Sequence, residues 1–269
     1  MMRQHFRRRD CAGVRNMLSL DIVIGVFVFF LGSILASFSG VVSERLGTGQ
    51  SFIQGRSRCN ACNRHLTGWD LFPVLSYLFQ KGRCRKCSAK ITYTYFLSEL
   101  ILGAVFVLEY QLYGLSLVLP LVYLFTFLLT IVVLYDLRHT VVPFKLSLFL
   151  VALGGLVAYL QSDSLSVLGM TCIEAGLIAL FFYLLHVLSF GRWMGLGDTP
   201  VALALSLFVT TQAIAGLLFS FWAGALVGIV ILVSTPASRR MGIEVPFVPF
   251  LAFGYLLALF TQWNPLLFF

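Results

Sequence analysis

The chain has 269 residues, of which 59% are hydrophobic and only 11% are charged. A soluble globular protein carries about 25% charged residues, so this composition excludes an ordinary soluble domain and indicates a membrane protein. The net charge of +8 would suit nucleic-acid binding. However, the positive residues lie in loops between apolar segments, which is typical of membrane topology.

Eight apolar segments predict an all-α polytopic membrane protein with about eight transmembrane helices. The sixth is short for a span and has Pro200 at its start, so it either tilts or packs inside the bundle. Gly114 makes a short turn between the second and third, as in an antiparallel helix pair. The segments are residues 22–42, 94–113, 115–135, 144–161, 167–189, 199–211, 213–233 and 247–263.

Positive charge after residue 20 is confined to alternate loops. The Lys and Arg residues number nine in 44–95, two in 136–145, one in 190–198 and two in 234–246. The intervening turns carry none. The positive-inside rule therefore makes the charged loops cytoplasmic, and eight spans then put both termini outside.

Five arginines before the first span break this pattern, because they fall on the predicted outer side. A cleaved signal peptide does not fit, since cleavage-site residues do not follow the apolar run. The first span is inverted or incomplete, or translation begins at Met17; we favour the start at Met17. The five residues are Arg3, Arg7, Arg8, Arg9 and Arg15.

Two aspartates stand at the edges of long apolar segments. Asp136 ends the third predicted span, and Asp198 begins the sixth after Gly195 and Gly197. Ionisable groups at a membrane boundary are costly and usually functional. The order of the spans places both at the cytoplasmic face, although each alone could be a boundary residue snorkelling to water near an arginine. The glycines favour a site, because they permit close backbone approach or a helix break.

A carboxylate pair suits acid–base hydrolysis. Two neighbouring carboxylates cannot both ionise easily, so they share one proton. The ionised member would take a proton from the attacking water, and the protonated member would donate to the oxyanion or the leaving amine. Other acids fit less well, since Glu109, Asp163 and Glu174 fall on the outer side.

Four cysteines form two Cys-x-x-Cys pairs in the first charged loop. Cys59 and Cys62 make the first pair, and Cys84 and Cys87 the second. This spacing predicts a closed, structural tetrathiolate zinc site without a catalytic role. The loop is too short to build a core, so the metal would supply much of its folding energy. His65 is surplus to the set.

The charge of this loop has two interpretations. Residues 44–95 hold nine positive residues and two negative ones, Glu44 and Asp70. Zinc ribbons often bind nucleic acid, but this loop is tied to the bilayer at both ends. We therefore expect contact with anionic lipid headgroups and no nucleic-acid partner.

The ordered motifs together resemble the prepilin peptidases, or type IV leader peptidases, from the first span to the last. Asp136 with Pro143 is similar to the first catalytic motif of that family, and Gly195-Leu196-Gly197-Asp198 to the second, the GxGD motif. Glu99 falls where the family has a glutamate. The other matching stretches are Gly32-Ser33, Arg56–Cys59, Pro73–Leu78, Gly82–Cys87 and Val245–Ala252.

The resemblance implies a membrane aspartic endopeptidase that removes the leader of prepilins or pseudopilins at the cytoplasmic membrane face. Many members also methylate the new N-terminus with S-adenosylmethionine. Here Glu44 and Glu99 are candidates to orient the cationic donor or the new amine; the alternative is that they only pair with the nine nearby positive charges. The chain departs from the family pattern at Pro200, at Phe144 and in residues 39–45. The last departure weakens the case for methyl transfer more than the case for cleavage.

Two other classes remain open at this point. A small transporter would also carry acids within the membrane but should show internal repeats, and none is visible. A noncatalytic membrane scaffold with a zinc ribbon would need the cysteines but not Asp198. The predicted parts are an N-terminal basic segment at 1–21, a first transmembrane helix at 22–43, a cytoplasmic zinc-binding domain at 44–95 and a protease domain at 96–269.

Overall fold

The computed structural model describes residues 2–49, 51, 57–59, 61–235 and 245–263, with side chains from Leu20 onward. Within these ranges the chain is helical, without a strand. Two isolated antiparallel bridges, Arg58 with His65 and Arg83 with Lys90, are the only extended pairings described there. The prediction of an all-α protein is confirmed.

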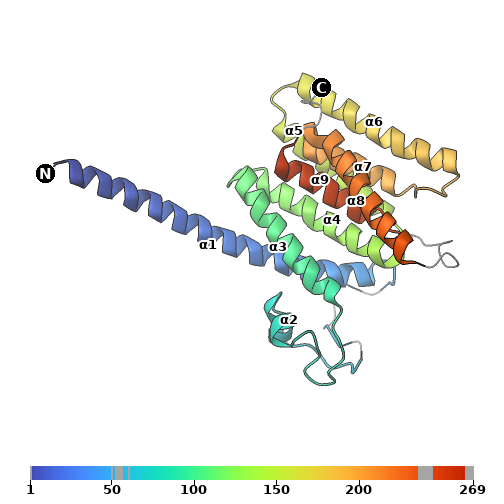
Figure 1. The fold of residues 1–269 in the computed structure, drawn as a ribbon, viewed down its shortest axis with the longest axis horizontal. Helices are drawn as coiled ribbons and strands as arrows, with labels where there is room; N and C mark the ends of the chain where they lie inside the picture. Colours follow the sequence, from blue (N-terminus) through green and yellow to red (C-terminus); the bar gives the residue numbers. More distant parts are fainter. Residues whose placement is uncertain (1, 50, 52–56, 60, 236–244, 264–269) are drawn as a thin grey trace. The chain divides into compact units, whose positions relative to one another are not determined.

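Each of the eight expected segments coincides with a helix (Figure 1). Six stretches are long and apolar enough to cross a membrane, and the last of them, Asp198–Ser234, contains both α7 and α8. Helix α9 is apolar but shorter. The helices are α1 (Met2–Arg45), α2 (Leu75–Phe79), α3 (Tyr93–Tyr113), α4 (Leu119–His139), α5 (Phe144–Gln161), α6 (Leu165–Ser189), α7 (Asp198–Val209), α8 (Ala213–Ser234) and α9 (Val248–Thr261), with 3-10 turns η1 (Gly68–Asp70) and η2 (Thr210–Gln212).

The chain divides into two compact units. The first contains residues 1–38 and 51–115, and the second residues 39–50 and 116–269. In the first unit, α1 and α3 cross closely at small residues. A Cβ added to Gly32 would lie 2.7 Å from the carbonyl oxygen of Leu102, and one added to Gly103 would lie 2.7 Å from Ser33 Oγ. Small residues permit this approach, as is common between membrane helices.

Helix α7 forms the core of the second unit. It packs mainly on α5 and α6 and also contacts α9, and Val201, Leu205 and Phe208 are fully buried. Its 12 residues rise only about 18 Å, against a hydrocarbon thickness of about 30 Å. The short sixth segment is therefore an internal helix, which is one of the two options left open by the sequence.

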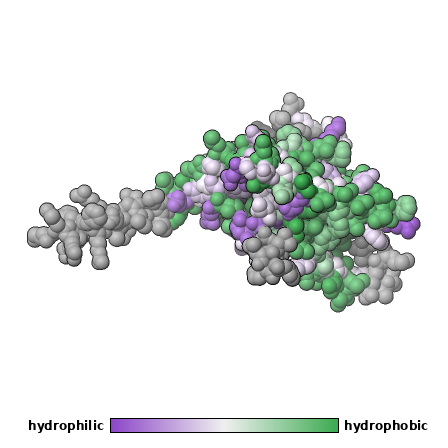
Figure 2. Space-filling view, turned by 90° about the horizontal axis from the view of Figure 1, so that it is seen from above, coloured by the Kyte–Doolittle hydropathy of each residue, from purple (hydrophilic) through white to green (hydrophobic). Residues whose placement is uncertain are grey.

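The outer helices present apolar side chains to their surroundings. Exposed leucines, valines and isoleucines extend along α6 and α8, and hydrophobic residues cover much of the surface in Figure 2. A soluble protein rarely exposes so large an apolar area, whereas a membrane span must.

Candidate active site

Asp136 lies in the last turn of α4, with only 3% of its surface exposed. Its Oδ2 atom accepts a hydrogen bond of 3.2 Å from the backbone N–H of Val248, the first residue of α9. The first N–H groups of a helix have no partner within the helix and carry partial positive charge. The start of α9 therefore orients and stabilises the Asp136 carboxylate.

Asp198 is the first residue of α7 and is 7% exposed. Its backbone N–H bonds to the carbonyl of Gly195 at 3.2 Å, so the glycine motif forms a tight turn into the helix. A Cβ added to Gly197 would lie 2.6 Å from the Cβ of Val142, in the loop that follows α4. Gly197 thus lets the second aspartate motif approach the first.

The close approach of Gly197 to Val142 brings the two aspartate motifs together, since Asp198 follows Gly197 and Val142 lies in the loop after the helix of Asp136. Pro143 is the N-terminal cap of α5 and completes the loop between Asp136 and that helix. Next to Asp198, the Thr199 hydroxyl is buried and has no hydrogen-bond partner within the described ranges. The arrangement brings two carboxylates into one low-polarity site, which is suited to acid–base chemistry.

The two motif glycines should respond differently to alanine. Gly197 has φ near −64°, so alanine there is strained only by its collision with Val142. At Gly195 the new Cβ would lie 3.6 Å from Asp198 Oδ2, an ordinary contact. We expect Gly197→Ala to reduce peptide cleavage far more than Gly195→Ala, measured as kcat/KM at equal protein content. Equal losses in the two variants would contradict a steric role for Gly197.

Arg138, two residues after Asp136, connects α4 to the end of α1. It donates to the carbonyl of Gly40 at 3.1 Å and to Ser43 Oγ at 2.7 Å, and its Nη2 lies 3.6 Å from Glu44 Oε1. Glu44 therefore has a cationic partner beside the Asp136 helix. A helix end carries partial negative charge, so Arg138 also stabilises the last turns of α1.

Glu99 is 8% exposed and holds the loop before α2. Its Oε2 accepts the backbone N–H of Val74 at 2.7 Å. Glu44 and Glu99 belong to different units, so their joint role in methyl transfer stays a prediction.

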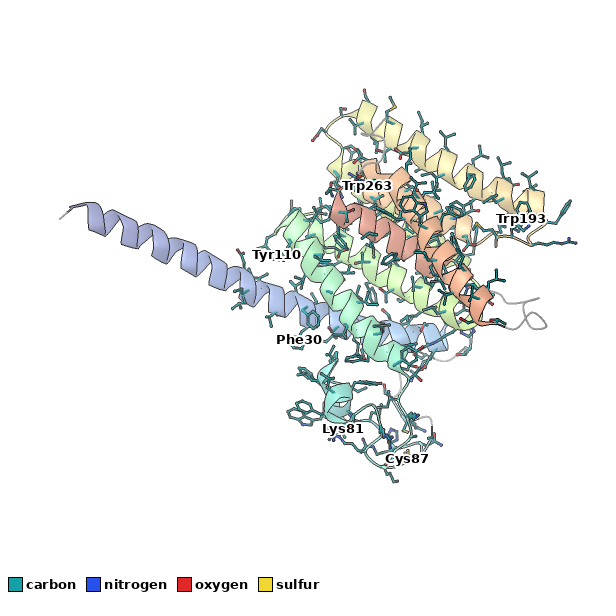
Figure 3. The ribbon with its side chains drawn as sticks, in the orientation of Figure 1. Phe30, Lys81, Cys87, Tyr110, Trp193 and Trp263 are labelled. Carbon is teal, nitrogen blue, oxygen red and sulfur yellow. The ribbon has the colours of Figure 1, made fainter. Side chains whose placement is uncertain are left out.

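The four predicted cysteines form one cluster, in which all four Sγ atoms lie within 4.8 Å of one another. Cys59 and Cys87 are separated by 3.8 Å between sulfurs; Cys87 is labelled in Figure 3. A tetrahedral metal with Zn–S distances of about 2.3 Å requires sulfurs about 3.8 Å apart. The cluster thus fits a metal ion of zinc's geometry.

Each cysteine pair begins with the same backbone turn. The N–H of Asn63 bonds to Cys59 O and that of Ser88 to Cys84 O, both at 2.9 Å. Backbone N–H groups of Cys62 and Ala61 lower the pKa of Cys59. Those of Cys87 and Lys86 lower the pKa of Cys84 to about 6. Such donors favour the thiolate, which is the form that binds a metal.

Asp70 joins the two cysteine turns from the loop between them. It forms ion pairs with Arg64, beside the first turn, and with Arg85, within the second. Burial by itself would raise the pKa of Asp70, but hydrogen bonds from the N–H and hydroxyl of Thr67 and the two arginine charges outweigh it and hold the pKa below its usual range.

We expect Asp70→Asn to loosen the metal site, because it removes both ion pairs at a side chain only 2% exposed. The cost should be roughly 1–3 kcal/mol, measured as faster zinc loss to a chromogenic chelator. Because the pKa of Asp70 is lower in the folded state than in the unfolded state, its ion pairs stabilise the fold at every pH above the unfolded-state pKa. That stability is lost only as the pH falls through the folded-state pKa. The ratio of variant to wild-type rates should therefore stay constant from pH 8 down to about pH 5. Asp163→Asn, at an exposed acid in another loop, is the control; a ratio that changes within this range would contradict the assignment.

Two family models match the chain over most of its length. The "Bacterial Peptidase A24 N-terminal domain" covers residues 30–113, and the "Type IV leader peptidase family" covers residues 123–233, including both aspartates. A prepilin leader peptidase/N-methyltransferase of Bacillus subtilis is 31% identical over 86% of this chain and 92% of its own. The chain belongs to the type IV leader peptidase family. The two cysteine pairs lie within the first matched region.

Other relatives carry the same name. The protein from Myxococcus xanthus is 30% identical over 79% of this chain and 64% of its own, and that from Dichelobacter nodosus is 31% identical over 73% and 68%. No solved structure matches the chain at a significant level. As a member of this family the chain is a peptidase, so the noncatalytic scaffold and the transporter are set aside.

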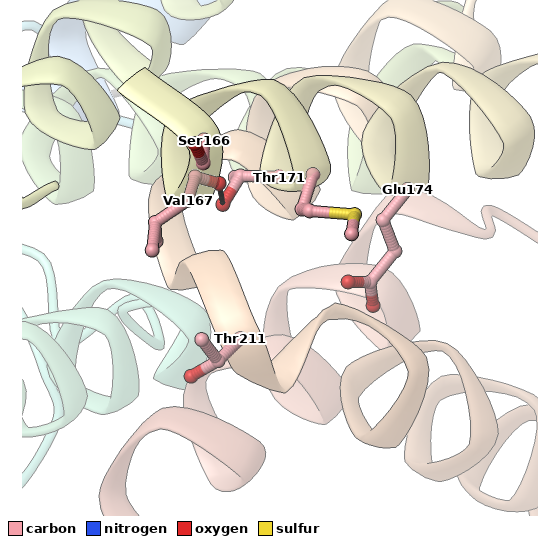
Figure 4. Close-up of a pocket in the computed structure, with 6 residues that line it drawn as sticks. Ser166, Val167, Thr171, Glu174 and Thr211 are labelled. Carbon is pink, nitrogen blue, oxygen red and sulfur yellow. Dashed lines mark hydrogen bonds between the residues drawn. The ribbon is translucent and has the colours of Figure 1, made fainter. Parts of the chain in front are cut away.

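A separate pocket of about 300 Å³ lies in the peptidase's second unit, between the start of α6 and the end of α7 (Figure 4). Glu174 borders it and accepts the Ile214 N–H at 3.2 Å, near the start of α8. Asp198 begins α7 and Thr211 follows its end, so the pocket is about one α7 length, roughly 18 Å, from Asp198. Glu174 is thus held by a backbone hydrogen bond and lies far from the aspartates.

The sequence did not reveal Val248 and Val142 as parts of the site. Val248 contributes a backbone N–H, and Val142 contributes only bulk against Gly197. Neither role depends on a reactive side chain, so residue type carries no signal for it. The stretch Val245–Ala252 resembled a family motif, but its contact with Asp136 could not be read from the sequence.

Proposed function

We propose that this peptidase is an aspartic endopeptidase that removes the leader peptide of prepilins or pseudopilins, with Asp136 and Asp198 as its catalytic pair. The observation that carries the proposal is that two buried carboxylates from separate motifs of the same unit stand on either side of the close approach of Gly197 to Val142. The names of the relatives support the substrate class.

The pair acts on the scissile peptide through water. One aspartate takes a proton from the water as its oxygen attacks the carbonyl carbon, and the other donates its proton to the carbonyl oxygen. As the tetrahedral intermediate collapses and the C–N bond breaks, the aspartate that took the water proton gives it to the leaving amine, and the other aspartate regains a proton from a hydroxyl of the intermediate. The Val248 N–H holds one oxygen of Asp136 and so fixes the orientation of this carboxylate.

We place the site at the cytoplasmic face of the bacterial inner membrane. The support is the distribution of positive charge, which falls in the loops on the same side as the two aspartates. Cysteine accessibility tests this placement. A cysteine at exposed Leu196, in a background without the native cysteines outside the metal site, should react with a membrane-impermeant maleimide only in inside-out vesicles.

We also propose that the four-cysteine cluster binds structural zinc. All four positions are protein ligands, so the site leaves no position for substrate or activated water, and the metal would only organise the loop. Cys59, Cys62, Cys84 and Cys87 would hold it.

Methyl transfer is a second candidate activity, favoured by the names of the relatives. It would use S-adenosylmethionine, with Glu44 and Glu99 as candidate residues. Against it, both glutamates already have partners, Arg138 and Val74 respectively.

One experiment tests both activities. The purified protein is incubated with a synthetic prepilin N-terminal segment and S-adenosylmethionine, and the products are weighed by mass spectrometry. We expect cleavage after a glycine and no added methyl group. A stoichiometric gain of one methyl, lost in Glu99→Ala while cleavage persists, would show a bifunctional enzyme. Failure to cut any prepilin would overturn the substrate class.

A further inference from the structure

The loop between the two cysteine pairs exposes an unusual amount of apolar surface. Over residues 69–79, here called the apolar segment, six large hydrophobic side chains are between 37% and 79% exposed. They are Trp69, Leu71, Phe72, Leu75, Leu78 and Phe79. The segment lies outside the long helices that can span a membrane, so transmembrane helix formation does not explain this exposure.

Three contacts fix the apolar segment against α1 and α3 within the first unit. Tyr77 stacks on Phe96 of α3, with ring centroids 4.7 Å apart. The Val74 N–H bonds to Glu99, one turn further along α3. Phe72 packs edge-on against Phe30 of α1 at 5.8 Å; Phe30 is labelled in Figure 3.

These contacts give the depth of the segment along the spans. Glu99 is the seventh residue of α3, about 9 Å from its first residue at 1.5 Å per residue. The Ser33 hydroxyl bonds to the Glu99 carbonyl, which sets α1 and α3 in register there. Phe30 precedes Ser33 by three residues in α1. Because α1 and α3 run in opposite directions, Phe30 lies about 4.5 Å further than Ser33 from the level at which α3 begins. Phe72 therefore reaches well past the beginning of the α3 span.

The backbone of the segment is held in a strained turn. Val74 has φ +63° and ψ −55°, and the Leu75 N–H bonds to the Pro73 carbonyl at 2.6 Å. A positive φ is rare for a β-branched residue and persists only where the surroundings enforce it. The buried Glu99 carboxylate, bound to the Val74 N–H, enforces it here.

The neighbouring surface of α3 is also apolar, and basic residues follow the segment. Leu97 and Ile101, one turn apart on α3, are 47% and 54% exposed, as expected for the lipid-facing stripe of a span. Five exposed basic residues follow the segment in the chain, of which Arg85 pairs with Asp70: Lys81, Arg83, Arg85, Lys86 and Lys90. Apolar and aromatic side chains followed by cations are typical of segments that lie in an anionic bilayer surface.

We propose that the apolar segment is inserted into the bilayer beside α1 and α3, so that the cysteine-rich domain is anchored in the membrane and is not suspended in water. Trp69, Leu78 and Phe79 contact lipid, and Lys81 and Arg83, which come next in the chain, meet lipid phosphates. Glu99 is the positioning residue that fixes the turn. This inference is independent of the peptidase chemistry.

Tryptophan fluorescence tests the proposal. The chain has four tryptophans, so Trp193→Phe, Trp222→Phe and Trp263→Phe leave Trp69 as the only reporter. The protein is reconstituted at one copy per nanodisc containing anionic lipid, and retained zinc confirms that the domain is folded. We expect Trp69 emission to be blue-shifted, quenched by lipids brominated near the headgroup end of the acyl chain, and protected from aqueous iodide.

The matched control moves the reporter within the same domain. Trp69→Phe with Lys86→Trp places it at an exposed position between the last two cysteines, and there iodide should quench and brominated lipid should not. The proposal is overturned if iodide quenches Trp69 as strongly as this control. It is also overturned if neither agent quenches Trp69, because that result would indicate a protein surface covering the segment.

Discussion

Replacing either aspartate by asparagine is expected to abolish leader removal while the protein stays folded and inserted. Asparagine has the size of aspartate, and its side-chain oxygen can still accept the Val248 N–H at position 136, so the fold should tolerate the change. The amide cannot take a proton from water or donate a carboxylic proton. Loss of general acid–base catalysis lowers a rate by roughly 10²–10⁴-fold. We expect the rate loss in either aspartate variant to approach the upper end of this range.

The measurement is the rate of prepilin cleavage by Asp136→Asn and Asp198→Asn in detergent, with folding checked by circular dichroism and zinc content. Glu174→Gln is the matched control, because Glu174 is another carboxylate of the same unit, bonded to a backbone N–H near the separate pocket. It should cut at close to the wild-type rate. Near-normal cleavage by either aspartate variant would remove the basis for the catalytic pair.

Replacing the second cysteine pair by serine should have the next largest effect. The cysteine-rich loop contributes few buried apolar residues; among its described residues only Val74 and Cys84 are buried hydrophobics. Metal binding therefore has to supply most of the folding free energy of the loop. In Cys84→Ser with Cys87→Ser, we expect zinc to fall from about one per chain to none, with the loop open to proteolysis.

Elemental analysis and limited proteolysis check this expectation. Cys172→Ser is the control, because Cys172 is exposed on α6 and lies outside the cluster; it should keep the zinc. Wild-type protein that carries no zinc, or that forms disulfides among the four cysteines, would contradict the metal assignment.

Local patterns predicted the helices and marked the candidate site residues. Apolar runs of about 20 residues marked the spans, and the Cys-x-x-Cys spacing marked a cluster that the structure describes within 4.8 Å. Asp136 and Asp198 stood out because acids are rare at the ends of apolar segments. These signals lie in residue type and spacing, so they can be read without knowing which helices touch.

Only the tertiary structure shows which helix is buried and which groups contact the candidate site residues. The burial of α7 depends on its packing by α5, α6 and α9, and the partner of Asp136 is a main-chain N–H 112 positions away. The depth of the apolar segment depends on contacts of Phe72 and Val74 with separate helices. Every non-proline residue carries the same backbone donor, so residue identity cannot reveal which donor meets a given carboxylate. That choice is made by the packing of distant segments.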